Sequence, residues 1–533
     1  MAKHRPPRQG FVLDVDKSTP PILFHNGDGF RLERLPPGRS RIVYPAEPLA
    51  GLPDPEGSIR NALLHPIDHD PLPALLRPGM KLTIAFDDIS LPLPPMRSPD
   101  IRQRVIECVL DMAAEAGVDD VHIIAALALH RRMTEAELRH AVGVRVYDAF
   151  APRGLLYNHD AEDPDGMVIL GETPHGETVQ MNRRAAESDL IVYVNINLVA
   201  MDGGWKSTAT GLSGYAALKH HHNVHTMVHS RSFMDQHKSE LHKSNWRQGK
   251  VLRDAGVKIF QIETTMNADT FPSQLGFLNK REWEWSAKDQ ALMAGAKQAN
   301  DLAPPRIRRE FFRRIEAPYK VTGVNAGEVE AVHERTIENL HRQQLVEVQG
   351  QSDIAIFGIP YIGPYNVNSV LNPILVHCLG LGYLFNMYRN QPIVREGGVA
   401  ILFHPVPWEF NTIHHPSYID FFEEVLAETT DPKQIEATFE ERYAKDPWYI
   451  HLYRTSHAYH GVHPFYMWYW GAHGRDHCGD VIFVGGEPKS VARLGYRRAD
   501  SLRDALEMAK DTVGSGASIT YFHAPPIMIA DVK

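Results

Sequence analysis

The length, composition and charge of the chain exclude several classes of protein. Its 533 residues exceed the roughly 250 to 300 that one hydrophobic core organises, so we expect at least two domains. Hydrophobic residues at 43% and charged residues at 23% are typical of a soluble globular protein. A net charge of −9 without a basic block argues against nucleic acid as a partner, and the sequence has no apolar run of about 18 residues that could span a membrane. We therefore expect a cytoplasmic protein.

Cysteine and histidine contents limit the kinds of metal site. The three cysteines, Cys108, Cys378 and Cys478, lie far apart and form neither a disulfide framework nor a thiolate zinc motif, so we expect them to be buried as small apolar residues. The 29 histidines mean that a metal site here would use imidazole and carboxylate ligands.

The first part of the chain predicts strands that alternate with helices. Residues 1–75 are rich in Pro and Gly and are predicted to form an extended arm that packs on the first domain. A buried strand over 82–86 is followed by Asp87 and Asp88, and the segment 98–117 has helical spacing. A second strand, 121–129, precedes a helix opened by a capping box of Thr134 and Glu137.

Further strands are predicted at 190–195 and 257–263, which favours a mostly parallel sheet covered on both faces. Ligands of such sheets bind beyond the carboxyl ends of the strands. Four predicted strand-end residues are therefore expected to lie together: Asp87, Asp88, His130 and Asn195.

The second part of the chain predicts another α/β unit. Residues 286–344 are expected to be helical, broken at Pro304 and Pro305, and to form an interdomain hinge. Strands are predicted at 353–359, 398–404 and 480–485, and helices at 368–388, 418–428, 434–443 and 501–513. The expected fold is two α/β domains, an N-terminal one over 76–325 and a C-terminal one over 326–533 that closes over the substrate, with the active site in the interdomain cleft.

Three motifs could carry chemistry. In KHHHNVHTMVH (219–229), a helix would place His221, His225 and His229 on one face, where they could bind a metal or form a solvated surface. In DGGWKST (202–208), paired glycines allow a close backbone approach before Lys206, a cation or nucleophilic amine, or they mark an ordinary turn. In AALALHRR (125–132), His130 is placed as an acid or base with Arg131 for a carboxylate, although a lone histidine is often structural.

Read together, these motifs resemble the lactate racemase family. The similarity runs in the same order over roughly residues 80–525 and rests on FDDISLPLP (86–94), AALALHRRMTEAEL (125–138), the segment 158–190, DGGWKSTATGLSG (202–214) and HHHN (220–223). The segments GGVAILFHPVPWEF (397–410) and 479–509 resemble its C-terminal domain.

The resemblance implies a nickel-pincer nucleotide, a pyridinium-derived cofactor tethered to a lysine, which here would be Lys206. The nickel ligand would be His222, with His221 and His220 as substitutes. The acid/base histidine would be His130. Cofactor contacts are expected from Asp88, Ser90, Gly203, Gly204, Trp205 and Ser207. The family also implies transient contact with the proteins that make the cofactor.

Three departures from the family favour a substrate other than lactate. The second catalytic histidine falls at Asn195–Asn197, where Asn197 would take its place. The substrate-binding arginine falls on Leu91, with Arg97 close enough to replace it. A C-terminal lysine is replaced by a segment with Asn366, Asn368 and Asn372. Asparagines would suit a larger polar substrate, whereas HPFYMWYW (463–470) would suit an aryl substituent or would simply pack in the core.

The sequence thus predicts a racemase or epimerase of a 2-hydroxy acid that moves hydride to the cofactor while a histidine takes the hydroxyl proton. Two alternatives stay open because one base is missing. One is an oxidoreductase or lyase with the same cofactor, and the other is a non-catalytic protein that binds nickel or the cofactor. The sequence does not indicate the oligomeric state.

Overall fold

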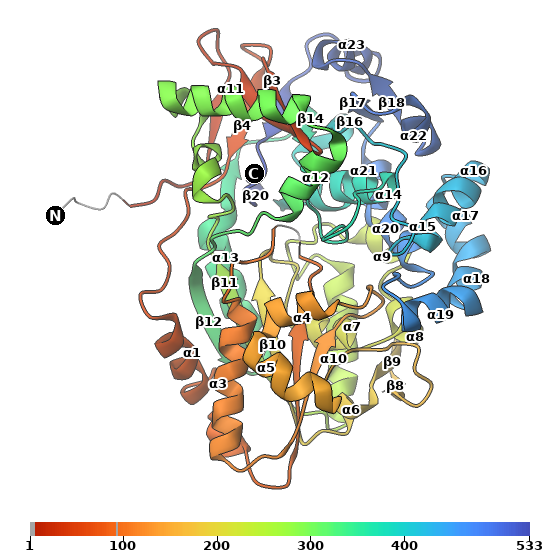
Figure 1. Ribbon diagram of the computed structural model, residues 1–533. Helices are drawn as coiled ribbons and strands as arrows, with labels where there is room; N and C mark the ends of the chain where they lie inside the picture. Colours follow the sequence, from red (N-terminus) through yellow and green to blue (C-terminus); the bar gives the residue numbers. More distant parts are fainter. Residues whose placement is uncertain (1–5, 92–93) are drawn as a thin grey trace, which may run out of the picture.

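A computed structural model describes residues 6–91 and 94–533 and contains two large sheets (Figure 1). The first five residues of the predicted arm, and positions 92–93 of the FDDISLPLP motif, lie outside the described residues. The sheets are mostly parallel, which confirms the predicted α/β class. No helix in the described residues has the length and apolar character of a membrane span.

The first sheet has six strands in the order β12-β11-β10-β5-β6-β7, all parallel except β12. Their bounds are β5 (Lys81–Asp87), β6 (Asp120–Ala126), β7 (Leu156–Asn158), β10 (Leu190–Asn197), β11 (Ile259–Met266) and β12 (Val321–Gly327). The predicted strands at 82–86, 190–195 and 257–263 are confirmed, and the one at 121–129 ends three residues earlier.

Apolar side chains point alternately to the two faces of the first sheet, and both faces are buried. Leu82, Ile84 and Phe86 pack with helix α3 (Ile101–Glu115), whereas Ala85 packs on the other face with Trp205 of α7 (Trp205–Gly211). The remaining helices around this sheet are α1 (Pro55–Leu64), α4 (Glu135–Val142), α5 (Val144–Phe150), α10 (Glu240–Asp254) and α13 (Val329–Gln344). The predicted capping box of Thr134 and Glu137 opens α4.

The second sheet has seven strands in the order β1-β4-β19-β14-β16-β17-β18, parallel except for the pair β1 and β4. Their bounds are β1 (Phe11–Asp14), β4 (Ser40–Tyr44), β14 (Ser352–Gly358), β16 (Val394–Phe403), β17 (Asp480–Val484), β18 (Arg497–Ala499) and β19 (Ile519–Phe522). Smaller sheets are formed by β2 (Ile22–Asn26) with β3 (Gly29–Glu33), by β8 (Met167–Glu172) with β9 (Thr178–Asn182), and by β13 (Leu345–Val348), β15 (Tyr388–Arg389) and β20 (Ile529–Val532).

The N-terminal arm departs from the expectation that it packs on the first domain. β1 and β4 pair within the second sheet, because β4 lies beside β19 from the far end of the chain. The later part of the arm contacts the first sheet at β12, through α1 and through backbone hydrogen bonds of Leu52 and Ile67. In Figure 1 the red strand β4 lies in the upper half with β14 and β16, away from α1. Because β4 and β19 are far apart in the sequence, no local sequence pattern predicts that they pair.

The predicted helical hinge contains a strand. Helices α11 (Ala287–Leu302) and α12 (Pro305–Arg313) are separated at the two prolines as expected, but β12 then follows and adds an antiparallel edge to the first sheet. The domain boundaries at 75 and 325 therefore remain predictions, and the second of them falls within β12.

The helices of the second half mostly follow the prediction. The segment predicted as a helix over 368–388 is helical only from α14 (Pro373–His377) through a π-helix over Cys378–Leu384, because Asn372 caps a helix whose first residue is a proline. The other α-helices are α15 (Pro416–Asp420), α16 (Leu426–Glu428), α17 (Pro432–Ile435), α18 (Glu441–Ala444), α19 (Pro447–Thr455), α20 (His463–Trp470), α21 (Ala472–His477), α22 (Pro488–Arg493) and α23 (Leu502–Val513).

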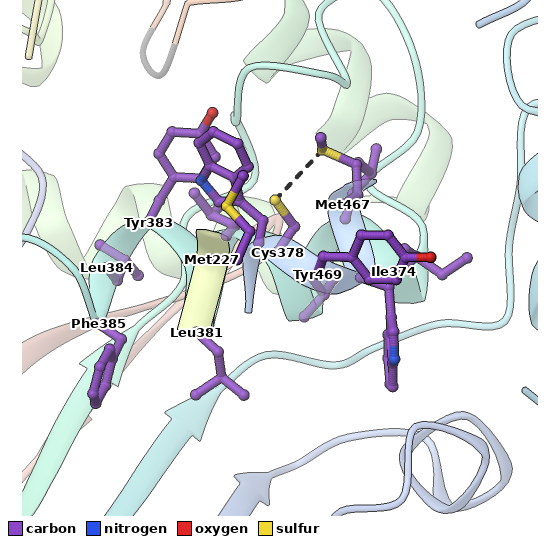
Figure 2. Packing of buried hydrophobic residues seen from close by; sticks show 14 of the residues in the cluster. Met227, Ile374, Cys378, Leu381, Tyr383, Leu384, Phe385, Met467 and Tyr469 are labelled. Atoms are coloured by element: carbon purple, nitrogen blue, oxygen red, sulfur yellow. Dashed lines mark hydrogen bonds between the residues drawn. The ribbon is translucent and has the colours of Figure 1, made fainter. Parts of the chain in front are cut away.

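The histidine-rich segment of the first half is held in the core of the second. Met227 of α9 (Val224–His229) is fully buried in the same hydrophobic cluster as Tyr383 and Leu381 of the π-helix (Figure 2). In the same core the thiol of Cys378 approaches the sulfur of Met467 at 3.6 Å. Cys378 is buried as expected, whereas Cys108 and Cys478 are partly exposed. Packing of α9 therefore fixes the preceding histidines against α20.

Candidate active site

A cavity of about 680 Å³, counted with its opening, lies where β5, β6 and β10 of the first sheet end. From the first half it is lined by Asp87, Asp88, His130, Asn195, Lys206 and His222, among others. From the second half it is lined by Tyr365, Tyr383 and Trp470. All four strand-end residues singled out by the sequence thus line one cavity.

His130 is held by Asp88 across two neighbouring strands. The Asp88 carboxylate accepts hydrogen bonds from His130 Nδ1 at 2.9 Å and from the amide and hydroxyl of Ser90, both at 2.9 Å. Burial alone would raise the pKa of Asp88, but His130 and the Ser90 donors outweigh it and hold that pKa below its usual value. Asp88 therefore stays ionised and fixes the imidazole, which can act as an acid or base toward the cavity.

Asp87 is oriented toward the other neighbouring strand, β10. Its carboxyl accepts hydrogen bonds from the Asn195 amide at 2.8 and 3.0 Å and from the Ile196 backbone amide at 2.9 Å. Burial raises the pKa of Asp87 to about 7, with nearby Asp202 adding to the rise while these donors oppose it.

A buried arginine fixes the turn that carries both aspartates. Arg102 is 1% exposed and forms an ion pair with Asp100, Nη2 to Oδ2 at 2.8 Å. Its Nη1 donates to the backbone carbonyls of Asp87 and Asp88 at 2.7 and 2.6 Å. Arg102 thus orients the peptide groups of the turn without neutralising the two carboxyl groups directly.

Lys206 brings an amine to the cavity from the first turn of α7. Its Nζ lies 3.2 Å from Asp202 Oδ1, and both side chains are about one-fifth exposed. Burial raises the pKa of Asp202, while the Lys206 ammonium opposes that rise. The amine is therefore paired but accessible.

The glycines before Lys206 are required by packing within the protein, not by approach to a ligand. Gly203 and Gly204 have φ of +100° and +58°, and a Cβ on Gly203 would lie 2.4 Å from Glu263 Oε1. The Gly204 amide donates to the same oxygen at 2.6 Å. The close approach predicted from the glycines is thus to buried Glu263. Gly203 and Ser207 line the cavity, but Gly204 does not, nor does Trp205, whose indole N–H donates to Glu330 at 2.9 Å.

The histidine run divides between the cavity and the surface. His222 lines the cavity, packs its ring 5.4 Å from that of Trp470, and shares a 2.7 Å hydrogen bond with His221 through their Nδ1 atoms. Burial lowers the pKa of His222 well below its usual value, which keeps the imidazole neutral and able to bind a metal. His220 and His221 are not among the lining residues.

The predicted metal-binding face of His221, His225 and His229 does not form. The helix begins at Val224, after His221, which is fully buried, whereas the other two are exposed. Over residues 6–91 and 94–533, no group of three or more His, Cys, Asp or Glu side chains has the arrangement of a metal site.

Three residues expected at the site lie elsewhere. Arg131 is 2% exposed and its guanidinium donates to both oxygens of Glu137, at 2.6 and 3.0 Å, so it is not free for a substrate carboxylate. Arg97 is exposed and does not line the cavity. Asn197 is fully buried and donates to the Asp202 carbonyl at 2.9 Å; Asn195 lines the cavity instead.

The contribution of the second half is aromatic. Asn366, Asn368 and Asn372 do not line the cavity: they hydrogen bond to the Tyr361 carbonyl, to Glu137 and to the first turn of α14, respectively. Sequence reasoning missed Tyr365 and Tyr383, whose hydroxyls lie 3.0 Å apart. Helix α20 is buried along its whole length, as core packing predicts, yet its last residue, Trp470, reaches the cavity.

Replacing Arg102 with Ala should destabilise the protein by about 3 to 5 kcal/mol, because it leaves Asp100 as an uncompensated buried charge. The measurement is the shift in the urea unfolding transition. Arg145→Ala is the matched control, since the Arg145 side chain is 68% exposed and should change stability by less than about 0.5 kcal/mol. If both substitutions lowered the stability equally, Arg102 would not be what holds the turn in place.

Comparisons with known proteins point to the lactate racemases. Residues 27–235 match the family model of the lactate racemase N-terminal domain. The chain is 26% identical to the lactate racemase of Lactiplantibacillus plantarum over 170 residues, which is 31% of this chain and 38% of that protein. Its fold resembles the lactate racemase apoprotein of Thermoanaerobacterium thermosaccharolyticum, with a TM-score of 0.59 and 16% identity, covering 96% of this chain and 99% of that one. Residues 27–235 thus resemble the lactate racemase N-terminal domain, and the chain as a whole shares the fold of a lactate racemase.

Proposed function

We propose that the chain is a racemase or epimerase of a 2-hydroxy acid other than lactate, acting in this cavity with a nickel-pincer nucleotide. One observation carries the proposal: a carboxylate-held histidine, an amine and a neutral imidazole, from His130, Lys206 and His222, line the same cavity in a chain that resembles this family.

The residues of the cavity fit the cofactor. Lys206 offers the amine for a covalent tether, and its partner Asp202 has a second carboxylate oxygen without a hydrogen-bond partner in the described part of the chain. His222 offers one ring nitrogen, since the other is occupied by His221. When bound, the cofactor supplies a nickel centre with a hydride-accepting ring.

The chain itself moves the hydroxyl proton. His130 takes the proton of the substrate hydroxyl, and Asp88 stabilises the imidazolium that results because it stays ionised beside Nδ1. Loss of hydride from Cα leaves a keto acid in the cavity. Return of hydride to the opposite face of the carbonyl gives the other stereoisomer.

The walls of the cavity favour a substrate with an apolar or aryl substituent. Leu91, Tyr383 and Trp470 supply apolar surface, and the Trp470 indole N–H is a buried donor without a partner in the described residues. Lys206 is the one lysine or arginine that lines the cavity in the part of the chain described. With Lys206 tethered, the substrate carboxylate binds neutral donors such as the tyrosine hydroxyls and this indole.

A chiral assay tests the proposed function. Protein made together with the cofactor-producing enzymes is incubated separately with each enantiomer of a panel of aryl and alkyl 2-hydroxy acids. A racemase gives the same mixture from either enantiomer. Net conversion of one enantiomer to a keto or dehydrated product would instead support the oxidoreductase or lyase alternative, and nickel binding without turnover the non-catalytic one.

Replacing His130 with Ala should lower the racemisation rate by about 10²- to 10⁴-fold, the usual contribution of a positioned acid or base. The rate is measured by chiral chromatography at saturating substrate. His122→Ala is a suitable control, because His122 lies within β6, the strand that His130 follows, and does not line the cavity. An unchanged rate for His130→Ala would remove this residue from the mechanism.

Replacing His222 with Ala should reduce the nickel content of the purified protein, because the neutral imidazole in the cavity is lost. His225→Ala is the matched control: it belongs to the same histidine run but is exposed, and it should leave nickel near its wild-type level. Elemental analysis gives the metal per chain. Equal losses from the two variants would show that nickel is held at the surface and not in the cavity.

A further inference from the structure

The two aspartates at the end of β5 bond toward different neighbouring strands and line the same cavity. β5 lies between β6 and β10 in the sheet. Asp88 bonds to His130, which follows β6, whereas Asp87 bonds to Asn195 and Ile196 of β10. Both carboxyl groups line the cavity. An acid–base group is therefore present on the β6 side, and a second carboxyl occupies the β10 side.

Asp87 is held by a network that fixes its orientation. The Asn195 side-chain oxygen accepts hydrogen bonds from Ser207 Oγ at 2.9 Å and from the amide of Gln261, so its amide nitrogen must turn toward Asp87. That nitrogen reaches both carboxyl oxygens of Asp87. The family resemblance predicts a second catalytic histidine in this stretch of β10, and here an asparagine places a neighbouring carboxyl instead.

The charges around Asp87 leave its carboxyl able to exchange a proton. Arg102 binds the backbone carbonyl of Asp87 and not its carboxyl, and Tyr193 approaches one carboxyl oxygen at 3.4 Å. Of the charged groups close by, Asp202 disfavours ionisation of Asp87, whereas the Arg102 guanidinium favours it. Because burial raises the pKa of Asp87 to about 7, both of its protonation states are accessible near neutral pH. Asp87 is partly exposed, and it is accessible from the cavity.

We propose that Asp87 is the second catalytic acid–base residue and serves the enantiomer whose hydroxyl lies on the β10 side, opposite to the one served by His130. The inference rests on the proposed function. In this step the substrate O–H bond breaks and its proton passes to the Asp87 carboxylate. The Cα hydrogen leaves with its electron pair to the hydride acceptor of the proposed cofactor, and the carbinol carbon is oxidised to a ketone. In the reverse step hydride returns to carbon and Asp87 returns the proton to oxygen.

Single-turnover oxidation tests this assignment, because each enantiomer then reports on one base. Cofactor-loaded protein in excess is mixed with each enantiomer, quenched in acid, and assayed for keto acid by mass spectrometry. Asp87→Asn should lower the rate of keto acid formation about 10²- to 10⁴-fold with one enantiomer, and His130→Ala should do so with the other. Asp189→Asn is the matched control, since this partly exposed carboxylate binds the Lys81 amide at the opposite end of β5 and should leave both rates unchanged.

The outcomes separate the inference from the function on which it rests. If wild-type protein forms keto acid from both enantiomers and Asp87→Asn slows both equally, or neither, the assignment of Asp87 is overturned. If wild-type protein forms keto acid from neither enantiomer, the proposed function itself fails.

A measurement on the wild-type protein keeps the test valid if Asp87→Asn does not fold. Asp87 must be ionised to accept a proton, so the half-reaction that it serves should slow about tenfold per pH unit below pH 7, with an inflection near that pH. Infrared difference spectra of protein without cofactor should show a carboxyl group that titrates over the same range. A carboxyl band that titrates only near pH 4, together with no such inflection for either enantiomer, would overturn the proposal.

Discussion

The structure of the site depends on the hydrogen bonds that Arg102 donates to the backbone at the end of β5. A buried guanidinium, balanced by Asp100, donates to two consecutive backbone carbonyls, those of Asp87 and Asp88. Holding both peptide groups fixes the backbone from which the two side chains leave the end of the strand. One carboxyl meets His130 and the other meets Asn195. The placement of both carboxyl groups in the cavity depends on this interaction.

The cavity becomes complete only when the two halves of the chain pack together. The first half contributes the polar groups at the strand ends, and the second contributes Tyr365, Tyr383 and Trp470. Burial of Met227 of α9 in the core of the second half holds His222 against Trp470. Imidazole, amine and carboxyl groups are thus enclosed by aromatic surface, where charge–charge interactions are strong and water is limited. Such surroundings suit the proposed hydride transfer, because they limit reaction of the transferred hydride with water.

Local sequence patterns predicted much of the first sheet and part of the site. Strand-end placement brought Asp87, Asp88, His130 and Asn195 together correctly, because the carboxyl ends of parallel strands meet at one edge. Contacts between distant residues explain the failures. Arg131 appeared free, but Glu137 of the following capping box binds it. The strands β1 and β4 pair with β19, nearly the whole chain away. No periodicity in the sequence reports such pairings, nor the burial that raises the pKa of Asp87.

The central claim is that stereochemistry is inverted through hydride transfer from carbon, with only the hydroxyl proton handled by the chain. Racemisation of a 2-hydroxy acid carrying deuterium at Cα, in ordinary water, tests this claim most directly. Mass spectrometry of both enantiomers after equilibration should find the deuterium retained at Cα, because it moves as a hydride and does not exchange with solvent. Loss of the deuterium to water would show that the Cα hydrogen leaves as a proton, and it would contradict the account.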